Sequence, residues 1–232
     1  MGGRQRGRPS GAGRLKVRLK TAKGRTPASQ RWLERQLNDP YVAAAKREGY
    51  RSRAAYKLIE IDDKRRLLKP GGRVVDLGAA PGGWSQVAAE RVRALEGRGQ
   101  VLAIDPIAME PIPGVVFLEQ DFTEPTAAAR LQALLRGGQA DVVLSDMAAQ
   151  GTGHSRTDHL RILGLAEAAA EFALEVLAPG GTFLCKMFQG GSERVLLDRL
   201  KRAFAGVRHV KPAASRTESA ELYLLATAFR GP

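Results

Sequence analysis

The sequence predicts an α/β fold, a mostly parallel sheet of seven strands with helices on both faces. From residue 73 onward, short apolar runs alternate with longer amphipathic runs, which is the pattern of strands alternating with helices. The last two apolar runs are joined only by a turn-rich loop, 212–220, which predicts an antiparallel last strand. With 232 residues, 44% of them hydrophobic and 26% charged, the chain has the size and composition of one globular domain.

Each element in this region has a local reason. The strands are short runs rich in Val, Ile and Leu, expected at 74–78, 101–105, 115–118, 141–146, 182–188, 207–211 and 221–229. The helices have apolar residues every three or four positions and are expected at 84–95, 126–136, 158–177 and 193–204. Pro106 ends the second strand, and Pro179 followed by two glycines ends the long third helix.

A basic helical entry segment, 29–70, precedes this α/β core, 71–232, and we assign both to a single domain over 29–232. Ser29 is the expected cap of a first helix. Asp39 is the expected cap of a second, with Pro40 at the first helical position. Helical spacing then continues from Ser52, a candidate cap, to Leu68, and a Pro-Gly-Gly run ends it.

The N-terminal third is strongly basic. Residues 1–70 carry 20 basic and 6 acidic side chains, a net charge of +14, whereas the remainder is close to neutral. Residues 1–28 contain no acid, few large apolar residues and many glycines, so we expect a disordered basic arm. This asymmetry favours a polyanionic partner, either nucleic acid or an anionic membrane surface, over a merely solubilising tail.

Several classes are excluded. No apolar run reaches the roughly 18–20 residues of a membrane-spanning helix, so we expect no membrane segment. The single cysteine, Cys185, excludes an internal disulfide framework and fits a reducing compartment, so we expect a cytoplasmic protein. We also expect a monomer. The histidines His154, His159 and His209 match no metal spacing, and we expect no metal.

Acidic residues gather at strand ends. Asp76, Asp105 and Asp146 end three expected strands, and Asp121 follows another, so their carboxylates are expected at one edge of the sheet. The turn after the first strand reads G-A-A-P-G-G, which matches neither the dinucleotide fingerprint nor a P-loop. A nucleoside without pyrophosphate, held at its ribose by Asp105, therefore fits, and S-adenosylmethionine is such a ligand. The alternative is that the glycines serve packing and the acids cap helices.

Five sequence motifs resemble those of a known protein family. They are SRAAYKL at 52–58, DLGAAPGGWSQ at 76–86, SDMA at 145–148, KMFQG at 186–190 and SRTESAELYLLA at 215–226. In this order they resemble the FtsJ-type RNA 2′-O-ribose methyltransferases, the RlmE or RrmJ group, and the likeness covers about residues 29–230. The resemblance implies the Rossmann-like fold of class I S-adenosylmethionine-dependent methyltransferases.

The resemblance also implies a catalytic tetrad of Lys57, Asp146, Lys186 and Glu221. A ribose hydroxyl becomes a good nucleophile when it loses its proton, and only a neutral lysine can take that proton. Lys186 is our candidate base, because it lies in an otherwise apolar strand where an unpartnered lysine is rare. Lys57 would orient the hydroxyl, Asp146 would position Lys186, and Glu221 would complete the hydrogen-bond frame. Cys185 is expected to face the core on the opposite side.

For the cofactor, the resemblance assigns a set in which Asp105 holds the ribose and Asp121 the adenine amino group. The set is Gly82, Trp84, Asp105, Asp121 and Asp146. For Trp84, a place in the core at a helix start is the alternative.

The basic surface for RNA is expected to include Arg51, Arg53, Lys64, Arg65, Arg66 and Arg216.

Two positions depart from the family pattern. Ala149 and Gln150 follow SDMA where the family often has Pro and Asn, so we expect a different shape for the loop 150–157. The run before Tyr223 lacks an arginine that bacterial members often carry, so one RNA contact is expected to be missing.

The resemblance implies 2′-O-methylation of a uridine in large-subunit ribosomal RNA, on the assembled subunit. The alternatives are a related enzyme acting on transfer RNA or a messenger cap, and a non-catalytic RNA-binding assembly factor. A nicotinamide-dependent oxidoreductase is a weaker third.

Overall fold

The computed structural model describes the chain except residues 1–23, 25, 150–153, 189–192, 217–218 and 232. The described residues form one seven-stranded sheet in the order β3-β2-β1-β4-β5-β7-β6. The strands are β1 Arg73–Leu77, β2 Gln100–Asp105, β3 Val115–Glu119, β4 Ala140–Ser145, β5 Leu177–Phe188, β6 Phe204–Val210 and β7 Glu221–Phe229. The predicted elements are present, with ends that differ by a few residues.

The pairing confirms the predicted sheet. Strands β1 to β5 pair in parallel, whereas β7 lies between β5 and β6 and is antiparallel to both. The short connection before β7 allows this reversal, since an antiparallel neighbour needs no helical crossover.

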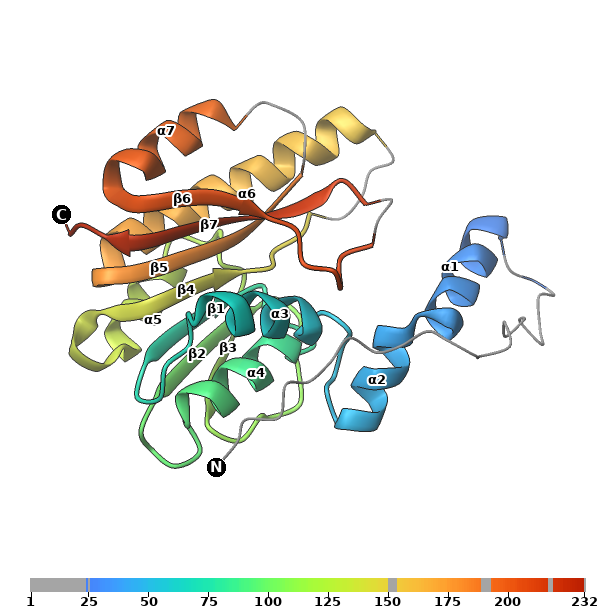
Figure 1. Ribbon diagram of the computed structural model, residues 1–232, viewed down its shortest axis with the longest axis horizontal. Helices are drawn as coiled ribbons and strands as arrows, with labels where there is room; N and C mark the ends of the chain where they lie inside the picture. Colours follow the sequence, from blue (N-terminus) through green and yellow to red (C-terminus); the bar gives the residue numbers. More distant parts are fainter. Residues whose placement is uncertain (1–23, 25, 150–153, 189–192, 217–218, 232) are drawn as a thin grey trace.

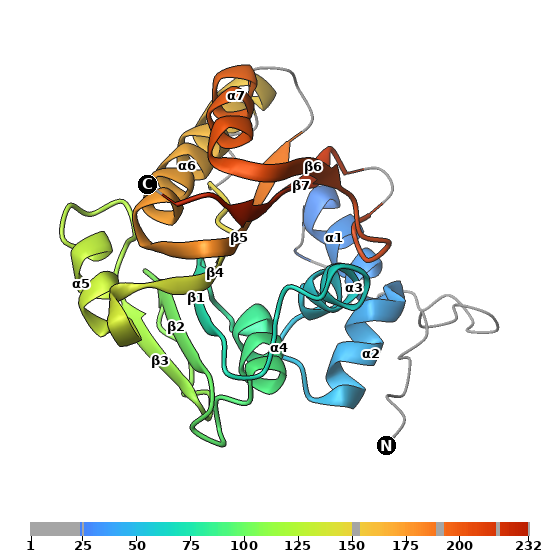
Figure 2. The ribbon, with the colours of Figure 1, turned by 60° about the vertical axis from the view of Figure 1, so that its left-hand side comes forward.

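Helices cover both faces of the sheet. The core helices are α4 Gly83–Val92, α5 Ala127–Leu134, α6 Ser155–Val176 and α7 Arg194–Ala203, with a short 3-10 turn η1 at Arg136–Gly138. Figures 1 and 2 show α6 and α7 on one face, and α4 with the entry helix α3 (Ala55–Arg65) on the other. The chain therefore forms a three-layer α/β structure.

Two apolar clusters hold the layers together because side chains alternate along each strand. On β1, Val75 and Leu77 pack into the cluster under α5, α6 and α7, whereas Val74 packs under α3 and α4. Cys185 lies fully buried in the first cluster, on the face predicted for it, and burial raises the pKa of its thiol.

The entry segment forms three helices, with two corrections to the predicted caps. Helix α1, Pro27–Asn38, is capped by Thr26, whose side chain accepts from the Ser29 N–H, so the helix begins before Ser29. Helix α2, Pro40–Glu48, is capped by Asp39 as predicted. Helix α3 begins at Ala55 without a side-chain cap, and Ser52 lies outside it.

Figure 1 shows α1 extending away from the α/β body, with α2 between α1 and the sheet. Most of the predicted arm, residues 1–23 and 25, and part of the loop 150–157 lie outside the described residues. Within the described chain, no helix combines the length and apolar character needed to span a bilayer.

Candidate active site

Lys186 and Asp146 meet at the carboxyl end of the parallel strands. Lys186 lies near the end of β5, and Asp146 directly follows β4. The Lys186 Nζ is 2.9 Å from the Asp146 Oδ1 and donates a second hydrogen bond of 2.7 Å to the Asp146 backbone carbonyl. Only 9% of the Lys186 side chain is exposed, so the predicted buried lysine has the carboxylate partner that it needs.

Lys57 and Glu221 form a second ion pair beside the first. Lys57 comes from the first turn of α3, and Glu221 is the first residue of β7. The Lys57 Nζ lies 2.6 Å from the Glu221 Oε1, with 9% and 15% of the two side chains exposed. Ser215 donates a hydrogen bond of 3.1 Å to the same Glu221 oxygen. The structure thus brings together all four residues of the predicted tetrad.

Tyr223 connects the two ion pairs and was missed by the sequence analysis. Its hydroxyl donates to the Asp146 Oδ1 at 2.8 Å, accepts from the Lys57 Nζ at 3.2 Å and lies 3.3 Å from the Glu221 Oε1. A signal was available, because alternation along the strand puts residues 221 and 223 on one face. The pairing of Tyr223 with Lys186 across β5 and β7 completes the cluster.

The electrostatics of the cluster favour an ionised Asp146. Burial by itself would raise the pKa of this carboxyl, but the nearby ammonium groups of Lys186 and Lys57 and the hydrogen bonds that it accepts outweigh burial and lower its pKa. Burial, together with the charges of Asp146 and Glu221, raises the pKa of Tyr223 well above its usual value. The Tyr223 hydroxyl therefore remains a neutral donor.

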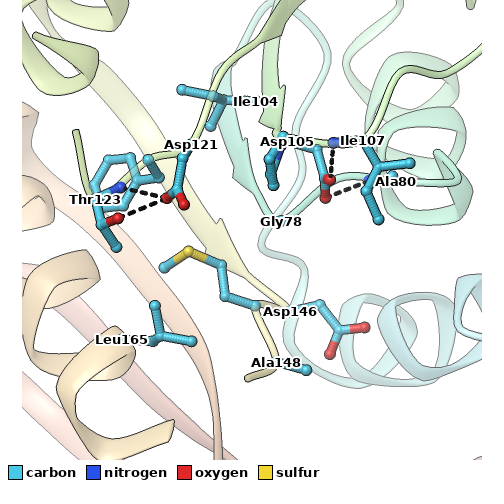
Figure 3. A pocket seen from close by; sticks show the side chains of 13 residues that line it. Gly78, Ala80, Ile104, Asp105, Ile107, Asp121, Thr123, Asp146, Ala148 and Leu165 are labelled. Carbon is cyan, nitrogen blue, oxygen red and sulfur yellow. Dashed lines mark hydrogen bonds between the residues drawn. The ribbon is translucent and has the colours of Figure 1, made fainter. Parts of the chain in front are cut away.

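A cavity of about 570 Å³ opens beside this cluster, with Asp146 on its wall. Its volume is within the range of small-molecule sites. Most of the lining is apolar or backbone, and the residues are Gly78, Ala80, Ile104, Asp105, Pro106, Ile107, Asp121, Phe122, Thr123, Asp146, Met147, Ala148 and Leu165 (Figure 3). Strand β1 has β2 on one side and β4 on the other, so the strand order reverses at β1. The cavity lies at this point, which is the usual ligand position in open α/β sheets.

Two predicted carboxylates are fixed on the cavity wall by backbone N–H groups. Asp105 accepts from the Ala80 N–H at 3.0 Å and the Ile107 N–H at 2.8 Å, as Figure 3 shows. Asp121 accepts from the N–H and hydroxyl of Thr123, and these bonds lower its pKa. The lowered pKa keeps Asp121 ionised, and both carboxylates are held in a fixed orientation with lone pairs left for a ligand.

The charge of the cavity selects among ligands. It has three carboxylates, and no Lys or Arg is present among the described residues that line it. A phosphate would therefore have no cationic partner in the cavity. A ligand with hydroxyls, an amine and a positive charge would instead find three carboxylates as acceptors and counter-charges. The site therefore fits a cationic nucleoside and does not fit a dinucleotide.

The structure places Gly82 and Trp84 elsewhere than the cavity wall. Trp84 is 3% exposed, and its ring packs 5.5 Å from that of Tyr223 while its indole N–H donates to the Ala54 carbonyl. This is the alternative position considered for it, a core aromatic at a helix start. Gly82 has a positive φ of 108° just before α4, where Ile112 and Arg51 pack against it. Neither residue is among those described as lining the cavity.

The predicted basic surface is only partly exposed. The Arg51 guanidinium donates to backbone carbonyls, and Arg53 pairs with Asp39 and donates to the Ala214 carbonyl. Residues 64–66 are exposed, but they lie at the other end of α3, about 10 Å along the helix from Lys57. Arg216, with its Nη2 3.6 Å from the Asp39 carboxylate, stays near the tetrad through Ser215.

Comparison with known proteins agrees with this geometry. Ribosomal RNA large subunit methyltransferase E from Xanthobacter autotrophicus is 68% identical over 217 residues, covering 94% of this chain and 85% of that protein. The protein of the same name from Parvibaculum lavamentivorans is 61% identical over 233 residues, covering 97% and 91%.

Among solved structures, a Plasmodium falciparum protein described as a ribosomal RNA methyltransferase superimposes with a TM-score of 0.69 at 34% identity. The superposition covers 79% of this chain and all of that one. The model of the FtsJ-like methyltransferase family matches residues 50–229, a range that includes the whole tetrad and all the cavity-lining residues. The chain belongs to the FtsJ-like methyltransferase family.

Proposed function

We propose that this protein methylates a ribose 2′-hydroxyl of RNA with S-adenosylmethionine, and that its substrate is a uridine of large-subunit ribosomal RNA. The observation that carries the proposal is the double position of Asp146. Its side chain pairs with Lys186 inside the cluster and also lines the cavity. A methyl donor in the cavity and a proton acceptor in the cluster would therefore lie on two sides of one carboxylate.

The chain has suitable groups for the cofactor. Asp105 would accept hydrogen bonds from the ribose hydroxyls, Asp121 would accept from the adenine amino group, and Phe122 and Ile107 supply apolar wall for the base. When bound, S-adenosylmethionine supplies a methyl group on a positively charged sulfur. The carboxylates of the cavity complement that charge.

The proposed chemistry of the cluster is proton removal and charge stabilisation. Once it has released its own proton, Lys186 would accept the proton of the 2′-hydroxyl. The ammonium that results already has two acceptors in place, the Asp146 Oδ1 and the Asp146 carbonyl. Lys57, held by Glu221 and by the Tyr223 oxygen, would donate to the hydroxyl oxygen as negative charge develops there. Glu221 and Tyr223 position these groups.

The RNA substrate is supported by the relatives' names and by the charge of the chain. The relatives from Xanthobacter and Parvibaculum are named for the large-subunit ribosomal RNA. The net charge of +13 in this chain suits a polyanionic partner.

The test replaces Lys186 in two ways. Lys186→Ala removes the amine, and Lys186→Arg keeps a cation beside Asp146 but cannot accept a proton, because a guanidinium remains charged. Both should lower the methylation rate by about 10²- to 10⁴-fold, with Lys201→Ala, an exposed lysine of α7, as the matched control. Radiolabelled methyl transfer is measured on assembled large subunits, free ribosomal RNA, transfer RNA and capped RNA.

Near-normal activity of Lys186→Arg would show that the residue acts by charge and not as the base. Activity on transfer RNA or capped RNA equal to that on ribosomal RNA would refute the proposed substrate. If the wild-type protein transferred no methyl group to any RNA, the proposed methyltransferase activity would be refuted.

A further inference from the structure

Arg51 joins two loops that are far apart in the sequence. Its Nη1 donates to the Pro81 carbonyl at 3.3 Å and to the Glu110 carbonyl at 2.5 Å, and its Nη2 donates to the Pro111 carbonyl at 2.8 Å. The Arg51 backbone N–H donates to the Gln86 side chain on α4 at 2.8 Å, which fixes the position of the Arg51 backbone. One guanidinium thus holds the loop after β1 against the loop after β2.

These two loops are opposite parts of the cavity wall. Ala80, next to Pro81, lines the cavity, as do Pro106 and Ile107 at the start of the second loop. Asp105 already links the same loops from inside the cavity, because its two oxygens accept from the Ala80 and Ile107 N–H groups. Arg51 links them from outside, since it is not among the described residues that line the cavity.

Gly82 makes this outer link possible. A Cβ on Gly82 would lie 2.5 Å from the Ile112 Cδ1 and 3.3 Å from the Arg51 side chain, and the φ of 108° would itself strain any other residue. The glycine is therefore required for the close approach of Arg51 and the second loop to the first.

We infer that Arg51 is a positioning residue for the cofactor, one that fixes the spacing of the two loops and so the place of the Asp105 carboxylate. This inference rests on the proposed function, since it takes the cavity to be the S-adenosylmethionine site. Lysine should not replace the arginine, because a single ammonium cannot supply the two separate donor nitrogens with which the guanidinium contacts the three carbonyls. Arg51 thus contributes to binding by holding the two loops together, since its guanidinium donates to their backbone carbonyls.

Arg53 provides an internal comparison two residues away. Its Nη2 donates to the Ala214 carbonyl at 2.6 Å and its Nε lies 2.8 Å from Asp39, so it holds the loop that carries Ser215 and leads to Glu221. Arg51 therefore supports the cofactor side of the site, and Arg53 supports the catalytic side.

The experiment measures S-adenosylhomocysteine binding by calorimetry and amide hydrogen exchange of residues 106–113 in the cofactor-free protein. Arg51→Met and Arg51→Lys should each raise the dissociation constant about tenfold or more, because binding must then order the loops. They should also speed exchange in 106–113. The Michaelis constant for S-adenosylmethionine should rise while kcat at saturating cofactor stays near that of the wild type.

Two further variants serve as comparisons. Arg53→Gln should lower kcat and leave the dissociation constant unchanged, and Arg98→Gln, an exposed site with the same loss of charge, should change neither. If Arg51→Met fails to fold by circular dichroism, Arg51→Lys decides. Wild-type affinity or wild-type exchange in the folded Arg51 variant would overturn the inference alone, whereas a wild-type protein that does not bind S-adenosylhomocysteine would overturn the proposed cofactor as well.

Discussion

Replacing Asp76 by asparagine should make the protein more stable at neutral and alkaline pH. Asp76 is fully buried near the end of β1. Its Oδ2 accepts a hydrogen bond of 2.6 Å from the Ser85 hydroxyl, whereas its Oδ1 has no partner in the described part of the chain. Burial, with a smaller contribution from the charges of Asp146 and Asp105, raises the pKa of Asp76 to about 7 against the lowering effect of Ser85.

The sign follows from proton binding in the two states. An unfolded aspartate titrates near pH 4, so between pH 4 and 7 the native state holds a proton that the unfolded state has lost. The stabilisation from Asp76 is fully present below pH 4 and decreases as the pH rises toward 7, by about 1.4 kcal/mol per pH unit. Over about three units this amounts to roughly 4 kcal/mol.

Asparagine does not titrate in this range, so the Asp76→Asn variant lacks that slope. The free energy of unfolding of the variant minus that of the wild type should therefore increase by about 2 kcal/mol between pH 5 and pH 7. Urea unfolding at pH 5, 6, 7 and 8, followed by the fluorescence of the buried Trp84, measures this difference. Ser85→Ala, which removes the bond that lowers the pKa, should extend the loss of stability to higher pH. A difference between variant and wild type that stays constant from pH 5 to pH 8 would refute the reasoning.

Two other predictions concern the tetrad and the basic arm. Tyr223→Phe keeps the ring against Trp84 but removes a hydrogen bond to the Asp146 carboxylate, so urea unfolding should show a loss of about 1.5–3 kcal/mol. Single-turnover methylation should slow about tenfold or more as Lys57 loses an acceptor; unchanged stability and rate would contradict the linking role of the hydroxyl. Deleting residues 1–25, which carry nine cations, should weaken RNA binding and flatten the dependence of log affinity on log salt concentration. Cofactor affinity should not change, and an unaltered salt slope would show that the arm does not contact phosphates.

Residue patterns in the sequence could identify only part of the tetrad. The lysine in the apolar strand at 186 and the carboxylates at strand ends were predictable from burial and strand periodicity alone. Lys57 and Glu221 by themselves look like surface charges, and only the motif resemblance marked them. The role of Tyr223 depends on the register between β5 and β7, which pairs it with Lys186. Register is a contact between distant segments, and no local pattern in either strand specifies it.

The glycine-rich turn and the arginines of the entry segment show the opposite case. Composition predicted phosphate contacts for Arg51 and Arg53, but the fold directs Arg51 to carbonyls 30, 59 and 60 residues away in the chain and Arg53 to one 161 residues away. Cofactor binding by Gly82 and Trp84 stays a prediction: neither is among the described residues that line the cavity, and the fold packs Trp84 against Tyr223 and Gly82 against Ile112.

The amino-acid sequence alone determined the α/β class, the strand ends that carry acids and the excess of positive charge, because these depend on hydrophobic period and residue type. Tertiary structure decided which charged groups are partners and which reach solvent. The physical reason is that a side chain's burial and hydrogen bonds depend on segments that only folding brings beside it.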